Sequence, residues 1–148
     1  MPWSKPVPCD LTRTSTRVSV PQSYAEKVPA LPGVCVIIRL DKSTVDGRIL
    51  NIGETGNLQQ RIAGGAPHAP AQAITSDILA KKLPDKSKAV WMITNNDDDA
   101  LQLKRALITL FRSEFGRRPA YNRTGGNTAN YARFQAEYGE LKQHVMAL

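Results

Sequence analysis

Residues 33–61 decide the fold and read GVCVIIRLDKSTVDGRILNIGETGNLQQR. Residues 33–40 form a β-branched apolar run, and residues 48–53 form a second, shorter apolar run. Such side chains are typical of strands, and the turn-rich segment between the two runs contains Asp46-Gly47, a dipeptide favoured in hairpin turns. The sequence therefore predicts a β-hairpin that begins at Gly33.

A short helix is expected directly after the hairpin. Thr55 or Asn57 provides its N-cap, because either side chain can accept a hydrogen bond from a free N–H group of the first turn. Leu58 and Ile62 supply the apolar positions, and Gly64-Gly65 supplies a stop signal. The distance between cap and stop predicts a helix of about two to three turns.

Four further elements are expected beyond this helix. Residues 72–83 have a helical pattern, residues 88–94 favour a third strand, and residues 100–115 show the strongest helical periodicity of the chain. Residues 127–147 predict a final amphipathic helix. The three aspartates at 97–99 are expected to cap the helix that follows them and to complement its positive end.

The chain is expected to form one domain preceded by an arm. Its 148 residues suit a single hydrophobic core. Residues 1–32 hold six of the ten prolines, so this Pro-rich N-terminal arm is expected to be irregular. Residues 33–148 are expected to form an α/β domain with a central three-stranded, mostly antiparallel sheet, flanking helices and a C-terminal helix.

Composition and net charge indicate which partners and which cellular compartment to expect. Twenty Lys and Arg residues against 13 Asp and Glu give a net charge of +7, which favours a polyanionic partner such as nucleic acid or an acidic protein surface. The chain has no apolar run that could cross a bilayer and no apolar secretion segment, so we expect a cytoplasmic protein without a membrane partner. Cys9 and Cys35 are expected to stay reduced, and the spacing of Cys and His gives no support for a zinc site.

The hairpin, the helix after it and the long helix carry a series of short motifs. In chain order they are Gly33-Val34-Cys35, Asn51-Ile52-Gly53, the pattern x-T-x-N-L-x-x-R at residues 54–61, A-L-x-L-K-x-x-L-I at residues 100–108, and Pro119-Ala120-Tyr121-Asn122. In this order and spacing they resemble the motifs of the GIY-YIG nuclease superfamily. The resemblance covers residues 33–122 and implies a small GIY-YIG-like domain.

The resemblance also implies a catalytic centre, from which this chain departs. Family members are understood to use strand tyrosines as general base or its helper, a helix Arg as an electrostatic clamp, and a helix Glu that holds one divalent metal. Arg61 and the supporting Asn122 are retained, whereas Cys35 and Asn51 replace the tyrosines and Lys104 replaces the glutamate. A protonated lysine only donates hydrogen bonds and cannot ligate a metal. We therefore expect a degenerate centre with little or no metal-dependent cleavage, and no cofactor or bound metal.

Lys104 is the oddest local feature, because helical spacing places it within the apolar face that contains Ala100 and Leu107. In one interpretation its stem packs on this face and its ammonium reaches solvent or a carboxylate such as Glu54. In the other, its charge holds a phosphate beside Arg61.

The remaining family positions also have structural interpretations. Cys35 lies within an apolar strand and is expected to be a small buried side chain rather than a nucleophile. Asn51 is a polar residue at a strand end, with contact to a phosphate as its alternative. Arg61 is expected either to contact phosphate or to pair with Glu54 or Asp77 at the surface.

A basic surface is expected near the retained asparagine. Residues 100–123 carry six Lys or Arg residues and one acid. Arg117, Arg118 and Arg123 flank the asparagine, and Lys81-Lys82 are candidates for the same face. Binding of phosphates by such a cluster would depend on salt and largely ignore sequence, while a solvated charged face is the alternative.

Three functions follow from these observations. The leading hypothesis is a nucleic-acid-binding protein on a GIY-YIG-type fold with a degenerate catalytic centre, with DNA favoured over RNA. One alternative is a divergent DNA endonuclease that hydrolyses phosphodiester bonds, with Tyr24 or Tyr121 as base and Mg²⁺ held by Glu54 or residues 97–99. The other is a protein-interaction module whose basic face binds an acidic partner. The aromatic residues of the final helix also suggest a homodimer.

Overall fold

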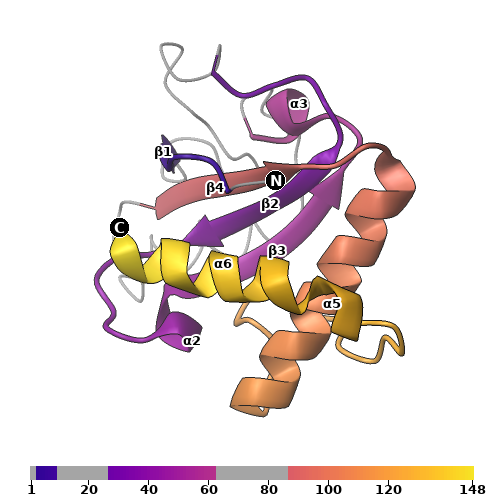
Figure 1. Ribbon diagram of the computed structural model, residues 1–148. Helices are drawn as coiled ribbons and strands as arrows, with labels where there is room; N and C mark the ends of the chain where they lie inside the picture. Colours follow the sequence, from indigo (N-terminus) through magenta and orange to yellow (C-terminus); the bar gives the residue numbers. More distant parts are fainter. Residues whose placement is uncertain (1–2, 10–26, 63–86) are drawn as a thin grey trace.

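The computed structural model describes residues 3–9, 27–62 and 87–148, which form one sheet with helices packed against it (Figure 1). The strands are β1 (Val7–Cys9), β2 (Gly33–Ile38), β3 (Ile49–Thr55) and β4 (Ser87–Ile93). The helical segments are α2 (Val45–Arg48), α3 (Leu58–Ile62), α5 (Asp97–Phe115), the 3-10 turn η1 (Ala132–Phe134) and α6 (Gln135–Ala147). The expected α/β architecture, with an antiparallel sheet, flanking helices and a C-terminal helix, is confirmed.

The sheet has the strand order β1-β4-β2-β3, and every neighbouring pair is antiparallel. β2 and β3 form the predicted hairpin, but the connection between them is wider than the tight Asp46-Gly47 turn that the sequence predicts. Residues 45–48 form the helical turn α2 instead, because the Thr44 side chain caps it by accepting a hydrogen bond from the Gly47 N–H (3.2 Å).

The N-terminal arm contributes a strand, so the expectation of an irregular arm is wrong for residues 7–9. β1 pairs with β4, with Val7 opposite Ala89. β1 lies at the end of the strand order, where proline is tolerated because its missing N–H need not complete a ladder. Just before β1, the Ser4 N–H donates to the Trp91 carbonyl (2.8 Å) and the Trp3 side chain is buried in the core.

Alternation along β2 divides the core between the two faces of the sheet. Val34, Val36 and Ile38 lie in the larger cluster, which the side chains of α5 and α6 complete. Cys35 and Ile37 point to the other face, where they pack with side chains of α3. Because both faces are covered, β2 is buried along its whole length.

The long helix α5 begins and ends at recognisable signals. Asn96 rather than an aspartate is its N-cap and accepts a hydrogen bond from the Asp99 N–H (2.8 Å). The three aspartates occupy the first turn, where their charges complement the helix dipole as expected. The helix ends at Gly116, whose φ of 75° is a left-handed conformation that favours glycine.

The last helix begins later than the sequence predicts. A helix was expected from residue 127, but α6 begins at Gln135 after the η1 turn. The first residues of the intervening segment bond to α5: the Thr128 N–H donates to the Thr109 hydroxyl (3.2 Å), and Arg112 donates to the Asn127 side chain (2.9 Å). The Thr109 hydroxyl thus satisfies the Thr128 N–H without a helical turn at that position.

Some expected features lie outside the described residues, namely the helix at 72–83 and the stop at Gly64-Gly65. α3 itself is confirmed as far as Ile62, with the Asn57 side chain accepting from the Gln60 N–H (3.0 Å) as its cap. Within the described ranges, none of the helices has both the length and the apolar character needed to span a bilayer.

The packing of α5 on the sheet predicts a large cost for Leu107→Ala. Leu107 is fully buried, so its truncation should lower the free energy of unfolding by about 2–5 kcal/mol. The same change at Leu31, which is 47% exposed, should cost less than about 0.5 kcal/mol. Urea denaturation of both variants measures the difference, and equal losses would contradict this core.

Candidate phosphate-binding pocket

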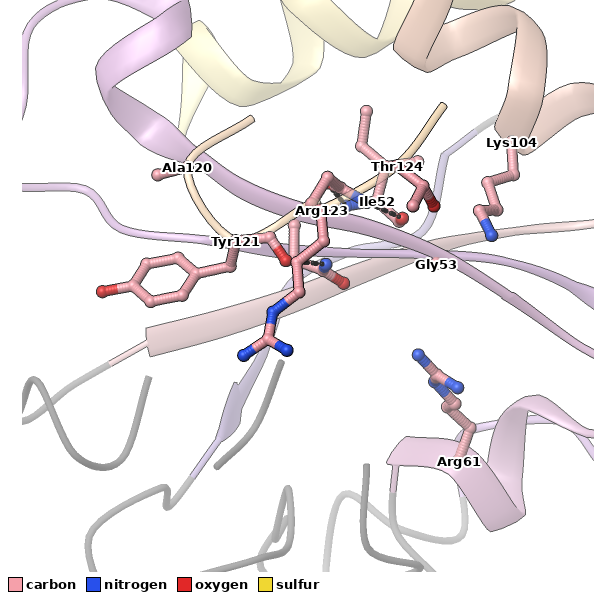
Figure 2. Close-up of a pocket in the computed structure, with 10 residues that line it drawn as sticks. Ile52, Gly53, Arg61, Lys104, Ala120, Tyr121, Arg123 and Thr124 are labelled. Atoms are coloured by element: carbon pink, nitrogen blue, oxygen red, sulfur yellow. Dashed lines mark hydrogen bonds between the residues drawn. The ribbon is translucent and has the colours of Figure 1, made fainter. Parts of the chain in front are cut away.

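A pocket of about 460 Å³ lies beside β3, the last strand in the sheet order (Figure 2). This volume is in the range of small-molecule sites. Its walls come from β3, α3, α5 and the loop after α5. The lining residues are Asn51, Ile52, Gly53, Arg61, Lys104, Ala120, Tyr121, Asn122, Arg123 and Thr124. We call it the β3-edge pocket.

The loop at residues 119–124 is fixed to the edge of β3 by paired hydrogen bonds. The Asn122 side chain accepts from the Ile52 N–H (2.9 Å) and donates to the Ile52 carbonyl (2.8 Å), as a neighbouring strand would. The Tyr121 N–H donates to the Leu50 carbonyl (2.8 Å). The predicted supporting role of Asn122 thus takes the form of loop positioning, with both ends of its amide engaged by the backbone.

Asn51 adds a buried contact beneath the same loop. Its side chain is only 3% exposed, and its amide donates to the Tyr121 carbonyl (3.1 Å). Asn51 lines the pocket, and one N–H group of its side-chain amide is used by the loop. Together Asn51 and Asn122 hold the wall of the pocket in one position.

Arg61 reaches the pocket from α3. Gly53 makes room for it: a Cβ atom at this position would lie 2.8 Å from the Arg61 Nη2 atom. Among the described residues, no carboxylate lies within ion-pair distance of the guanidinium; Asp77, one of its two expected partners, is outside those ranges. Its charge therefore faces the pocket with no neutralising carboxylate from the described ranges.

Lys104 enters the pocket from α5, across the edge of β3 from Arg61. Figure 2 shows the ammonium of Lys104 and the guanidinium of Arg61 directed toward each other. The Lys104 Nζ atom lies 3.8 Å from the Glu54 Oε1 atom, and both side chains are partly exposed, at 27% and 32%. The expected pairing with Glu54 is present, and the same side chain also lines the pocket beside Arg61.

Cys35 is not among the residues that line the pocket. The side chain is 6% exposed and packs with Ile37 and Leu58 in the smaller core cluster. Burial raises the pKa of its thiol to about 11, and the nearby charge of Arg61 only partly offsets this rise. At neutral pH the thiol is protonated, which agrees with a small buried side chain and not with an activated nucleophile.

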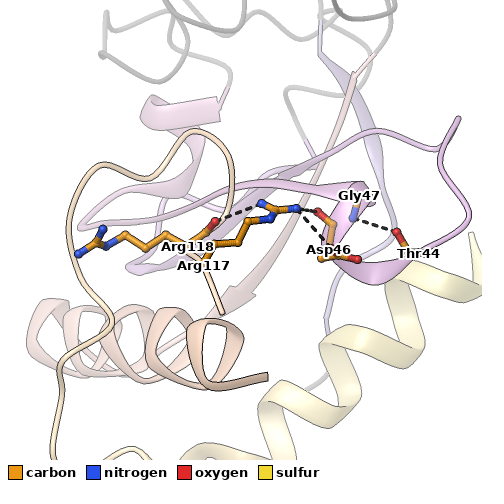
Figure 3. A network of polar contacts seen from close by, with 5 residues as sticks. All are labelled: Thr44, Asp46, Gly47, Arg117 and Arg118. Carbon is orange, nitrogen blue, oxygen red and sulfur yellow. Dashed lines mark hydrogen bonds and ion pairs between the residues drawn. The ribbon is translucent and has the colours of Figure 1, made fainter. Parts of the chain in front are cut away.

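The three arginines expected to form one cluster are dispersed. Arg123 is exposed and lines the β3-edge pocket. Arg117 and Arg118 point in opposite directions (Figure 3). Arg117 pairs with Asp46 of α2 (3.4 Å), and Arg118 donates to the Gly125 carbonyl (2.7 Å). Lys81 and Lys82, the other members of the expected basic surface, lie outside the described residues.

The carboxylates considered as metal ligands do not gather at the pocket. Glu54 pairs with Lys104, and the aspartates at 97–99 lie in the first turn of α5. In the part of the chain that the structure describes, no three His, Cys, Asp or Glu residues are grouped so that they could hold a metal ion.

Two residues of the loop after α5 line the pocket although the sequence motifs assign them no role in phosphate binding. Thr124 and Tyr121 line the wall, although Tyr121 was considered only as a base in the endonuclease alternative. The signal that could have placed them is their position beside Asn122. Because Asn122 anchors the loop to β3, the residues close to it in sequence lie at the same strand edge.

The chain was compared with protein-family models, with curated protein sequences and with solved structures, and none of the three comparisons finds a match.

Loss of the Asn122 side chain should release the pocket wall. Asn122→Ala leaves the Ile52 N–H and carbonyl without protein partners, so the free energy of unfolding should fall by about 1–3 kcal/mol. Asn127→Ala is the matched control, because Asn127 is exposed and its side chain accepts a hydrogen bond from the Arg112 side chain, and it should cost less than about 0.5 kcal/mol. Chemical denaturation distinguishes the two, and a neutral Asn122→Ala would contradict the anchoring role.

Proposed function

We propose that the protein binds nucleic acid by holding its phosphate backbone in the β3-edge pocket. The observation that carries this proposal is the convergence of Arg61 and Lys104 from opposite faces of the sheet, with Arg123 on the loop beside them. None of the described residues that line the pocket is an acid. A concave site with three cations and no lining carboxylate is complementary to a phosphodiester.

The chemistry of the three cations suits a phosphate. Arg61 and Arg123 offer planar guanidinium groups that can donate two parallel hydrogen bonds, and Lys104 adds a compact point charge. The net charge of +7 would draw a polyanion toward this site from a distance. Because phosphates carry no sequence information, binding through these groups is expected to be largely independent of sequence.

The proposal also includes a degenerate GIY-YIG-type centre. In the observed register Cys35 lies opposite Gly53 and Ile37 lies opposite Asn51, so the positions that correspond to the family tyrosines share the sheet face that α3 covers. Arg61 belongs to α3, and Lys104 lies across the strand edge from it. With a lysine in the place of the metal-binding glutamate, we propose that the site retains phosphate binding and lacks family-type cleavage.

Charge removal at the pocket should weaken binding. Lys104→Met keeps the apolar stem and removes the charge, so affinity for a labelled oligonucleotide should fall about ten-fold, with a salt slope lower by about one ion. Lys142→Met is the matched control, since Lys142 is 31% exposed, pairs with Glu114 and lies on α6, away from the residues that line the pocket. Fluorescence anisotropy across a salt series measures both, and equal affinities would contradict the proposed site.

Glu54→Gln should raise the affinity for the oligonucleotide. Glu54 competes with the phosphate for Lys104, so neutralising it should tighten binding by several-fold at low salt, while Glu114→Gln should leave affinity unchanged.

The same probes test cleavage. Single-stranded, duplex and branched DNA and RNA are incubated with Mg²⁺, Mn²⁺ or EDTA, and we expect binding without cleavage by the wild-type protein. Metal-dependent cutting that Arg61→Ala abolishes would contradict the degenerate centre and identify an endonuclease. Absence of binding to every nucleic acid at low salt would contradict the whole proposal and favour a protein-interaction module.

A further inference from the structure

Of the three cations among the described residues of the β3-edge pocket, Arg123 stands on a loop, whereas Arg61 belongs to α3 and Lys104 belongs to α5. The position of Arg123 therefore depends on what holds the loop. Asn122, the residue before it, is bonded through its side chain to the N–H and the carbonyl of Ile52 (2.9 and 2.8 Å). These two bonds fix the loop on one side of Arg123.

Arg118 holds the loop on the other side of Arg123. Its Nε atom donates to the Gly125 carbonyl (2.7 Å), and this contact is partly buried. Gly125 has a φ of 100° and lies directly on α5: a Cβ atom there would lie 3.2 Å from the Cδ1 and Cγ2 atoms of Ile108, which is fully buried. The loop is thus fixed at Gly125 both by a hydrogen bond and by close packing on a helix.

The span between the two anchors contains only Arg123 and Thr124, and both of these residues line the pocket. A backbone segment of two residues has little conformational freedom when the residues on either side of it are held. A binding group that is in place before its ligand arrives loses less conformational entropy on binding. Arg118 is not one of the described residues that line the pocket, so its bond to Gly125 can favour binding only through the loop.

The neighbouring Arg117 carries the same charge but makes different contacts. Figure 3 shows Arg117 directed toward Asp46 of α2 and Arg118 directed away from it. Arg117 pairs with the Asp46 carboxylate at 3.4 Å and also donates to the Arg118 carbonyl (3.3 Å). The two arginines therefore match in charge and in place along the chain, and they differ in the bond to Gly125.

We infer that Arg118 is a positioning residue of the proposed phosphate site. It fixes the loop through Gly125 so that Arg123 is held where it binds a phosphate, and it does not itself contact the nucleic acid. This inference rests on the proposed function. It gives Arg118 a role different from the direct phosphate contact that its place in a basic segment suggests.

The test is a double-mutant cycle, measured by fluorescence anisotropy with one labelled oligonucleotide at low salt. Arg118→Met removes the Nε donor and the charge but keeps an apolar stem, and Arg117→Met removes the same charge from the neighbouring position. We expect Arg118→Met to lose about five-fold more affinity than Arg117→Met. In an Arg123→Met background this excess loss should vanish, because the group that Arg118 positions is no longer present.

A second measurement on the free protein does not depend on binding. Amide ¹⁵N relaxation should show Arg123 and Thr124 to be as ordered as β3 in the wild type and in Arg117→Met, and more mobile in Arg118→Met. Thermal denaturation shows that each variant is folded before either measurement is made.

Equal loss of affinity in Arg118→Met and Arg117→Met would overturn this inference and leave the proposed function in place. An excess loss that persists in the Arg123→Met background would also overturn it, because Arg118 would then contact the nucleic acid itself. Unchanged order of Arg123 and Thr124 in Arg118→Met would contradict the positioning role whether or not the oligonucleotide binds. Failure of the wild type to bind would overturn the proposed function as well.

Discussion

The pairing of one side-chain amide with one backbone position supports the whole candidate site. β3 ends the strand order of the sheet, and its outer edge carries backbone N–H and carbonyl groups that need partners. Asn122 supplies both partners for Ile52, and Tyr121 supplies one for Leu50. Covering this edge with a loop protects the sheet from pairing with other chains. The same loop brings Arg123 to the pocket that Arg61 and Lys104 line.

The positive potential of the site arises because its cations have fewer carboxylate partners than several cations elsewhere on the described surface. Arg39, Arg117 and Lys142 form ion pairs with Asp41, Asp46 and Glu114, respectively, and such partly exposed pairs contribute little to stability. At the β3-edge pocket, Glu54 is the one carboxylate of the described ranges that pairs with a lining cation, at 3.8 Å from Lys104. Gly53 adds to this arrangement, because any side chain there would displace Arg61. Cations from separate elements thus converge at the pocket, where a bound anion can neutralise their charges.

Local patterns predicted the hairpin, α3, β4 and α5, because each depends on periodicity and capping within a short segment. Tertiary contacts decided the rest. β1 depends on pairing with β4, about eighty residues further along the chain. The prolines of the N-terminal arm indicate irregular structure, so the local sequence does not predict this strand. The segment before α6 is held by a bond from the Thr128 N–H to the Thr109 hydroxyl of α5. At the site, the sequence motifs identified Asn51, Arg61, Lys104 and Asn122 as candidates, and all four line the pocket. The sequence could not show that Arg117 and Arg118 point apart, since neighbours in a loop have no fixed relative direction.

Backbone amide NMR tests most directly whether a phosphate backbone binds at the edge of β3. A ¹⁵N-labelled sample is titrated at low salt with an unlabelled single-stranded oligonucleotide. Binding in the β3-edge pocket predicts progressive shifts of the amides of Gly53, Arg61, Lys104 and Arg123, with little change around Lys142 in α6. Shifts confined to α6, or no shifts at saturating oligonucleotide, would contradict the assignment of this pocket.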